Sequence, residues 1–322
     1  MPLDRHAKRF LDMVAIAKSE ASPLSADAMR QAFGRLASAA DVRDVAIGAC
    51  EDRTVPGPAG GIPVRIYAPA SAVAGPSPAL VFFHGGAGVF CSIETHDGFC
   101  RLLANASACR VISVGYRLAP EHRFPAAVDD ACASTAWVFA NGERLGIDTE
   151  RVGVAGDSAG ATLAAVVCRQ FAGISAPRIA LQVLICPVTD PGWDSPSRRE
   201  FARGYFFDTA TLDWALEHYL PAGAELSDPR LSPLRAADFR DLPPAHIHTA
   251  EFDPFRDDGE AYAAALERAH VPVAYACHKG MIHHFYCLAG VIPAARLVIE
   301  GIGRSAAAAL SGGELKCRPA LD

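Results

Sequence analysis

The sequence contains no run of about 18 consecutive apolar residues, the length that a membrane-spanning helix needs. It has no excess of basic residues either: 30 lysines and arginines stand against 36 aspartates and glutamates, a net charge of −6. This balance argues against a surface for nucleic acid or for an anionic membrane. The N-terminal segment has the spacing of an amphipathic helix and lacks the apolar core of a signal peptide. We therefore expect a soluble, cytoplasmic protein with no membrane or nucleic-acid partner.

No Cys-x-x-Cys pair occurs among the ten cysteines, which are scattered along the chain. Such scatter favours reduced, mostly buried thiols over a disulfide or zinc framework, and it favours a reducing compartment. His246 and His248 alternate along an apolar segment and would share one face of a strand, while His278 stands near His283. Because no cysteine or acidic partner stands at ligand spacing, we interpret these histidines as structural and expect neither a metal nor a cofactor.

Short apolar segments alternate with amphipathic ones over most of the chain, and no internal repeat is present. The N-terminus predicts helices at 4–19 and 25–39, followed by two early strands at 42–49 and 62–68. Further strands are expected at 79–83, 110–114, 151–155, 178–186, 245–250 and 271–277. Helices are expected at 97–106, 125–141, 158–171, 256–269 and 293–311. This alternation predicts an α/β fold with a mostly parallel central sheet flanked by helices on both faces.

The segment 190–221 interrupts the alternation with two short helical patterns and a concentration of aromatic side chains. These aromatics are Trp193, Phe201, Tyr205, Phe206, Phe207, Trp214 and Tyr219. Large apolar groups on an excursion from a sheet are typical of a lid over a site. A helical insertion that packs on its own core explains them equally well, so both interpretations stay open.

The stretch Gly156-Asp157-Ser158-Ala159-Gly160 lies between a predicted strand and the helical run that follows it. A serine on a sharp turn between a strand and a helix projects its hydroxyl out of the fold, and flanking glycines let the backbone turn without a clash. The pattern is typical of a nucleophile elbow. Ordinary tight turns that open a helix with a serine cap use the same residue types.

Three more polar motifs follow predicted strands. His84-Gly85-Gly86-Ala87-Gly88 follows strand 79–83, Asp253 follows strand 245–250, and His283 follows strand 271–277. Since the carboxyl ends of parallel strands meet at one edge of a sheet, we expect these residues to meet Ser158 there. A serine nucleophile needs an imidazole to take its proton and a carboxylate to orient that imidazole, and the chain order serine, aspartate, histidine is the one expected of this architecture.

Together these motifs resemble the hormone-sensitive lipase family, or bacterial family IV esterases, of the α/β-hydrolase fold. The resemblance extends from about residue 60 to residue 310 and rests on Gly156–Gly160, Tyr116–His122, Phe124–Ala127, Glu251–Asp257 and Gly280–Phe285. It implies a serine carboxylesterase that hydrolyses short- to medium-chain esters without a cofactor, and it implies a homodimer. It also implies N-terminal cap helices in 1–45, a core formed by 46–190 and 226–322, and a cap insertion in 191–225.

The resemblance further implies a role for each candidate site residue. Ser158 attacks the ester carbonyl, Asp253 holds His283, and His283 acts as base and then as acid. The backbone N–H groups implied for the oxyanion hole are those of Gly86, Ala87 and Ala159, with Gly85 adjacent.

Two positions depart from the family pattern. The family has glycine and then an aromatic residue where this chain has Ala87 and Gly88. Ala87 keeps its N–H, so we expect an intact oxyanion hole, with strain of about 1–2 kcal/mol if the position requires a positive φ. We also expect the loss of the aromatic to widen the acyl side of the pocket. His284 replaces a glycine and offers a second candidate for the base, although the motif register favours His283.

Several alternatives stay open. Glu251, Asp257 and Asp258 are rival acids, of which Asp257 and Asp258 are expected to serve the N-terminus of the helix 256–269. His84 is expected to hydrogen-bond its own loop rather than to act as a base. A lactone or an amide would use the same catalytic residues as an ester. A non-catalytic small-molecule receptor on this fold is a further alternative, and the complete serine, aspartate and histidine set argues against it.

Overall fold

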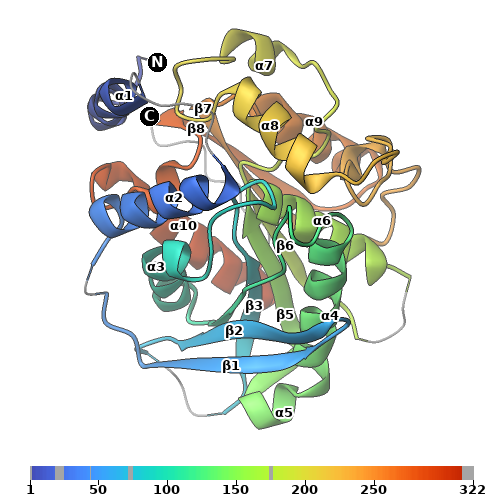
Figure 1. The fold of residues 1–322 in the computed structure, drawn as a ribbon. Coiled ribbons are helices and arrows are strands. Elements are labelled where there is room, and N and C mark those ends of the chain that lie inside the picture. The colour runs from blue at the N-terminus through green and yellow to red at the C-terminus, as the bar shows by residue number, and fades with distance from the viewer. Residues whose placement is uncertain (1, 19–24, 44, 72–74, 174–176, 314–322) are drawn as a thin grey trace.

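The computed structural model describes residues 2–18, 25–43, 45–71, 75–173 and 177–313 (Figure 1). Within these residues an eight-stranded sheet has the order β1-β2-β4-β3-β5-β6-β7-β8. The strands are β1 (Ala49–Gly57), β2 (Gly60–Ala68), β3 (Ser77–Phe83), β4 (Arg110–Val114), β5 (Ile147–Asp157), β6 (Leu181–Ile185), β7 (Ala245–Phe252) and β8 (Val273–Ile282). β2 is antiparallel to β1 and β4, whereas the strands from β4 to β8 pair in parallel. The sheet is therefore mostly parallel, with an antiparallel ribbon at one end.

Helices cover both faces of this sheet. On one face lie α3 (Asp97–Ser107) and α10 (Pro293–Leu310), which pack against each other and on the strands. On the other face lie α4 (Ala126–Ala140), α6 (Ala159–Gln170) and α9 (Arg256–Arg268), with the short α5 (Gly142–Leu145) beside β5. Because both faces are covered, an inner strand such as β3 is an unbroken apolar run and is buried from Ala79 to Phe83. Three 3₁₀ turns complete the list: η1 (Glu94–His96), η2 (Pro233–Arg235) and η3 (Phe285–Cys287).

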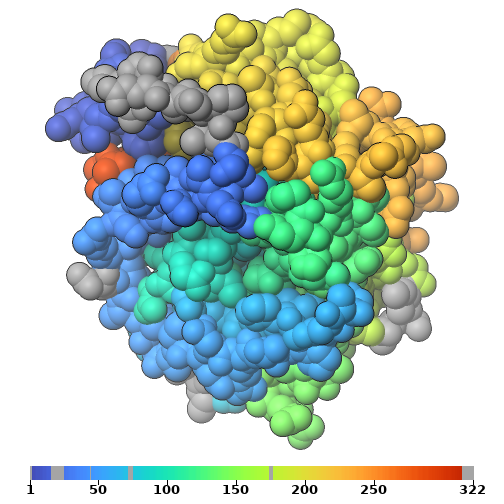
Figure 2. Space-filling view, in the orientation of Figure 1, coloured from blue at the N-terminus to red at the C-terminus, as the bar shows by residue number. Residues whose placement is uncertain are grey.

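Among the described residues, four further helices stand above the carboxyl edge of the sheet (Figure 1), and the blue and yellow parts of the chain that contain them cover the upper part of the face seen in Figure 2. These helices are α1 (Arg5–Lys18), α2 (Ala26–Ala40), α7 (Pro196–Glu200) and α8 (Thr209–Tyr219). A hydrophobic cluster joins Ala26 of α2, Phe90 of the loop after β3, and Phe207, Leu212 and Ala215 in or next to α8. The aromatic-rich segment thus packs on the N-terminal helix and on the loop below it, and its apolar side chains do not form a core of their own.

The expected strand at 42–49 is wrong. Of its described residues only Ala49 belongs to a strand, and the polar β1 that begins there pairs with β2 along its whole length. Val42, Val45 and Ile47 are apolar because they pack against the core on the α3 and α10 face, not because they extend a sheet. Most of β1 is exposed, so it carries little of the hydrophobic pattern that identifies a strand.

The other expected elements occur, the strand 110–114 with the expected bounds and the rest with shifted ends. β8 runs on to Ile282, so His283 follows the strand directly. Residues 19 and 314–322, which the expected helix 4–19 and the second core segment include, lie outside the described residues. Among the described residues, no helix combines the length and the apolar character needed to cross a bilayer.

Candidate active site

Ser158 occupies a sharp turn between β5 and α6. Its backbone has φ 52° and ψ −121°, a sparsely populated conformation for a residue with a side chain, and its N–H donates to the carbonyl of Ile185 at 2.8 Å. The flanking glycines are required by space: a Cβ on Gly156 would lie 2.3 Å from the carbonyl oxygen of Gly160, and one on Gly160 would lie 2.0 Å from that of Phe83. The turn is therefore the strained strand-to-helix elbow that exposes a nucleophile.

The loops after β5, β7 and β8 bring Ser158, Asp253 and His283 together. His283 Nε2 lies 3.1 Å from Ser158 Oγ, and His283 Nδ1 lies 2.8 Å from Asp253 Oδ2. The backbone N–H of Phe255 donates to the other oxygen of Asp253 at 2.7 Å. All three side chains are buried, and the rings of Phe207 and Phe255 pack on the imidazole. This arrangement can pass a proton between the hydroxyl and the imidazole while a carboxylate fixes the orientation of the ring.

His284, the second candidate base, points elsewhere. Its backbone is left-handed with φ 67°, and its ring stacks on Phe206 and meets the edge of Phe33 beneath the cap. Burial lowers its pKa to about 3, so the imidazole is neutral. The hydrogen bond to Ser158 comes from His283, as the motif register predicts.

The loop after β3 turns under the nucleophile. Gly86, Ala87 and Gly88 all have positive φ, at 102°, 52° and 73°. Gly86 cannot carry a side chain, because a Cβ would lie 2.0 Å from the carbonyl oxygen of Phe90. Ala87 does occupy the strained region anticipated for it, at a cost of about 1–2 kcal/mol. Ala159 begins α6, so its N–H is one of the first-turn donors that have no acceptor within the helix.

Asp157 is a buried carboxylate that the sequence analysis treated only as part of a motif. It accepts the backbone N–H of Gly85 at 2.9 Å and the hydroxyl of Tyr286 at 3.0 Å, and it lies 3.2 Å from His96 Nε2. Burial opposes its ionisation, but His96 and the hydrogen bond from Tyr286 outweigh that effect and hold the pKa of Asp157 below its ordinary value. In the sequence, the only sign of this role for Asp157 is its position next to Ser158.

His84 hydrogen-bonds within its loop, as expected. Its Nδ1 lies 2.7 Å from the carbonyl oxygen of Gly85, its ring stacks on Tyr116, and burial lowers its pKa to about 4. His248 and His278 stack on each other with ring nitrogens 3.2 Å apart. These contacts engage one nitrogen of each ring, while the buried His248 Nε2 has no hydrogen-bond partner.

Two groups among the described residues place three metal-ligating atoms within 4.8 Å of one another. They are His96 with His284 and Cys287, and Cys186 with Asp253 and His283. In the first group His96 Nδ1 hydrogen-bonds with Thr95 Oγ1, while His96 Nε2 lies 3.2 Å from Asp157 Oδ1 and has no hydrogen-bond partner. The second group includes the two side chains that hydrogen-bond to each other next to Ser158. The absence of a metal remains a prediction.

An apolar pocket opens at Ser158. It is lined by Ala87, Gly88, Tyr116, Ala127, Ser158, Ala159, Thr162, Leu163, Val188, Pro191, Phe207, Leu212, Ala215, Leu216, Tyr219, Arg230, Leu231 and Phe255. The expectation that Gly88 widens the acyl side of this pocket stays a prediction. A Cβ on Gly88 would lie 2.8 Å from two ring carbons of Tyr219, so a side chain from α8 already occupies that space.

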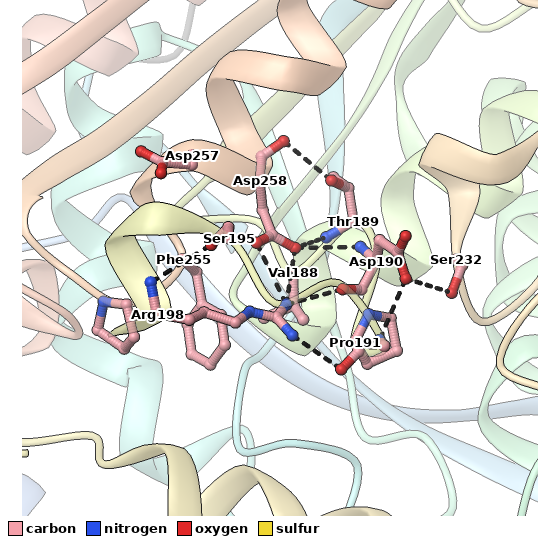
Figure 3. Close-up of polar contacts among 12 residues, drawn as sticks. Val188, Thr189, Asp190, Pro191, Ser195, Arg198, Ser232, Phe255, Asp257 and Asp258 are labelled. Carbon is pink, nitrogen blue, oxygen red and sulfur yellow. Dashed lines mark hydrogen bonds and ion pairs between the residues drawn. The ribbon is translucent and has the colours of Figure 1, made fainter. Parts of the chain in front are cut away.

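A buried ion pair ties α7 to α9, the helix that follows the loop carrying Asp253 (Figure 3). Arg198 Nη2 of α7 lies 3.0 Å from Asp258 Oδ1 of α9, and both side chains are buried. The Asp258 carboxylate also accepts the backbone N–H groups of Thr189 and Asp190, each at 3.0 Å. The Arg198 guanidinium lies over the ring of Phe255 at 5.2 Å.

Asp257 and Asp258 lie at the N-terminus of α9, as expected, and they also bind residues of another segment. Both lie in the first turn of α9, where Asp258 binds the Arg198 side chain and Asp257 accepts the backbone N–H of Ser197 at 2.8 Å. Burial raises the pKa of Asp258 to about 7, against the opposing effect of Arg198. These carboxylates therefore hold the cap segment in addition to facing the helix dipole.

Comparisons with known proteins agree on one fold and one type of chemistry. A family model described as alpha/beta hydrolase fold matches residues 80–287. An ethyl acetate hydrolase of Pseudomonas putida is 42% identical over 237 residues, 72% of this chain and 73% of that protein. An arylesterase of Saccharolobus solfataricus is 35% identical over 88% of this chain and 92% of its own length. The structure of a hyperthermophilic esterase from Pyrobaculum calidifontis superposes with a TM-score of 0.89 at 36% identity, covering 96% of this chain and 99% of that one.

Proposed function

Because the chain belongs to the hormone-sensitive-lipase-like, family IV carboxylic ester hydrolases of the α/β-hydrolase fold, we propose that it cleaves short- to medium-chain carboxylic esters through an acyl-enzyme on Ser158. The observation that supports this most is the pair of hydrogen bonds that links Asp253 to His283 and His283 to Ser158. The apolar pocket that opens at the hydroxyl supplies room for a hydrocarbon chain.

The mechanism follows from this order of groups. His283 Nε2 takes the proton of Ser158 Oγ as that oxygen attacks the ester carbonyl, and Asp253 stabilises the imidazolium that results. The N–H groups of Ala87 and Ala159, with that of Gly86, receive the negative charge that develops on the carbonyl oxygen. His283 then gives its proton to the departing alcohol. Water repeats the sequence on the acyl-enzyme and releases the acid.

The remaining expectations stay proposals. We propose that residues 1–45 and 191–225 form a cap over a core made of 46–190 and 226–322. We also propose a homodimer that acts in the cytoplasm without metal, cofactor or nucleic acid. The compartment is supported by the cysteines, since those within the described residues are all free thiols.

A panel of p-nitrophenyl esters from acetate to dodecanoate, with the matching lactones and anilides, tests the reaction. Wild-type protein should hydrolyse the shorter esters, and Ser158→Ala should lower kcat by about 10⁴-fold or more, because the remaining groups hold the substrate without a nucleophile. Faster turnover of the lactones or anilides would assign a different acyl substrate. Undiminished ester turnover by Ser158→Ala would refute the proposed nucleophile.

A further inference from the structure

The cap helix α8 presents one side to the candidate active site. The pocket is lined there by Leu212, Ala215, Leu216 and Tyr219, whose spacing places them on one side of the helix. Tyr219 is the last residue of α8, and its ring lies against Gly88 of the loop after β3. We propose that Tyr219 limits the length of the acyl chain that this enzyme accepts, an inference that rests on ester hydrolysis at Ser158.

The direction of proton transfer assigns the pocket to the acyl group. His283 has to give its proton to the oxygen of the departing alcohol, so this oxygen must lie beside Nε2. Ser158 and Ala159 line the pocket; Phe207 and Phe255, which pack on the His283 imidazole, form its wall on that side, and α8 forms another wall. The alcohol therefore leaves on the His283 side. The chain that stays bonded to Ser158 extends into the pocket toward α8.

Tyr219 is held in place from several directions. The backbone N–H of Phe124 donates to the carbonyl of Tyr219 at 2.9 Å. The guanidinium of Arg123 donates to the carbonyl of Glu217, two residues before Tyr219, also at 2.9 Å. The rings of Phe124 and Tyr219 meet edge to face with centroids 6.1 Å apart. Burial raises the pKa of the Tyr219 hydroxyl, so the side chain is neutral. The ring is therefore a fixed, uncharged wall of the pocket.

A side chain at position 88 would overlap the space that the Tyr219 ring occupies. A Cβ on Gly88 would come within 2.8 Å of the Tyr219 ring, a separation that real Cβ atoms essentially never show. The cap therefore supplies the aromatic group that the loop lacks at position 88. Shortening the side chain at 219 should open the pocket without changing the donors near Ser158.

Tyr219→Ala and Tyr219→Leu, with Tyr219→Phe as the matched control, test this assignment. The measurement is kcat/KM for p-nitrophenyl acetate and octanoate. We expect the ratio of octanoate to acetate to rise about tenfold or more in Tyr219→Ala and by less in Tyr219→Leu, because each added methylene then finds apolar surface. Tyr219→Phe keeps the ring and should keep the wild-type ratio.

Each other outcome has a defined meaning. An unchanged ratio in Tyr219→Ala and Tyr219→Leu, with normal acetate turnover, would overturn the inference and leave the proposed function intact. A shift in Tyr219→Phe equal to that in Tyr219→Ala would overturn it as well, since the hydroxyl would then decide the preference. Loss of acetate turnover in both shortened variants, at wild-type melting temperature, would mean that Tyr219 supports the reaction itself. Failure of wild-type protein on every ester would refute the proposed function instead.

A double-mutant cycle tests the shared space by a second route. Gly88→Phe should lower acetate kcat/KM in the wild-type background, where the new side chain collides with Tyr219. In the Tyr219→Ala background the same change should be milder and should restore the short-chain preference. Additive effects of the two substitutions would contradict the inference.

Discussion

His283 and His284 show how two adjacent residues of the same type acquire different chemistry. His283 is held between Asp253 Oδ2 and Ser158 Oγ, at 2.8 Å and 3.1 Å. His284 sits in the left-handed region, which turns its ring under the cap onto Phe206. The left-handed backbone at His284 therefore decides that the imidazole of His283, and not that of His284, reaches the Ser158 hydroxyl.

Alanine at position 283 and glycine at position 284 should have opposite consequences for turnover. His283→Ala should reduce kcat by about 10⁴-fold, because Ser158 loses its proton acceptor. His284→Gly should keep acetate turnover within about threefold of wild type, since its imidazole makes packing contacts only with groups outside the relay. Steady-state kinetics on the acetate ester decides the question, and an inactive His284→Gly beside an active His283→Ala would reverse the assignment.

At the scale of elements, a buried ion pair between Arg198 and Asp258 joins α7 to α9. Arg198 and Asp258 are both buried, and the two backbone N–H groups that Asp258 accepts come from the chain leading into the cap segment. Phe255 lies between Arg198 and His283, with its ring against both side chains. The ion pair therefore connects the position of the cap to the loop that carries Asp253.

Arg198→Met should destabilise the fold by roughly 3 kcal/mol, because it leaves a buried carboxylate without its cation. A carboxyl group whose pKa is higher in the folded than in the unfolded protein ionises more easily in the unfolded protein. The free energy of unfolding therefore falls as the pH rises from the unfolded pKa to the folded pKa. In wild type this loss should be complete near pH 7, the approximate folded pKa of Asp258. In Arg198→Met the pKa should be higher still, so the loss should continue above pH 7.

Thermal unfolding of both proteins at pH 6 and pH 9 measures this difference. The gap in Tm between wild type and Arg198→Met should widen at the higher pH. Arg199→Met is the matched control, since the Arg199 side chain pairs with an exposed Asp194 and should change Tm little. A gap that is the same at both pH values would mean that Asp258 does not titrate in this range.

For the whole molecule, the carboxyl edge of the parallel sheet concentrates groups that are far apart in sequence. Ser158 and His283, which hydrogen-bond, are separated by 125 positions. Behind them, Asp157 joins the end of β5 to Gly85 after β3, to His96 of η1 and to Tyr286 of η3. One buried carboxylate thus links four segments of the chain and fixes the loop that carries Gly86 and Ala87 beside the nucleophile.

Asp157→Asn should lower kcat on acetate by about 10- to 100-fold with a smaller change in KM. The amide keeps the volume but loses the charge that holds the Gly85 N–H, and hydrogen bonds to charged groups are worth about 1.5–3 kcal/mol. Tyr286→Phe removes a single donor to Asp157 and leaves the Gly85 contact intact, so its effect should be smaller. If Asp157→Asn lowered Tm but left kcat unchanged, the carboxylate would serve the fold alone.

Much of this architecture could be predicted from local sequence. Inner strands such as β3 are apolar throughout because helices cover both faces, and the elbow glycines mark a turn that admits no side chain on either side of the serine. A residue that directly follows a parallel strand must lie at the carboxyl edge of the sheet, so Ser158, Asp253 and His283 could be placed near one another. The polar, exposed β1 carries little of this pattern and was therefore missed.

The sequence by itself determined the fold class, the chemistry-bearing residues and the edge of the sheet where they meet, because each depends on residue type and on periodicity along one segment. Only the tertiary structure decided which ring fills the space beside Gly88, what Asp157 binds, and that Arg198 pairs with Asp258. Each of these contacts joins segments that are distant along the chain. Their distances depend on how the cap, the loops and the sheet pack together, and no local pattern records that packing.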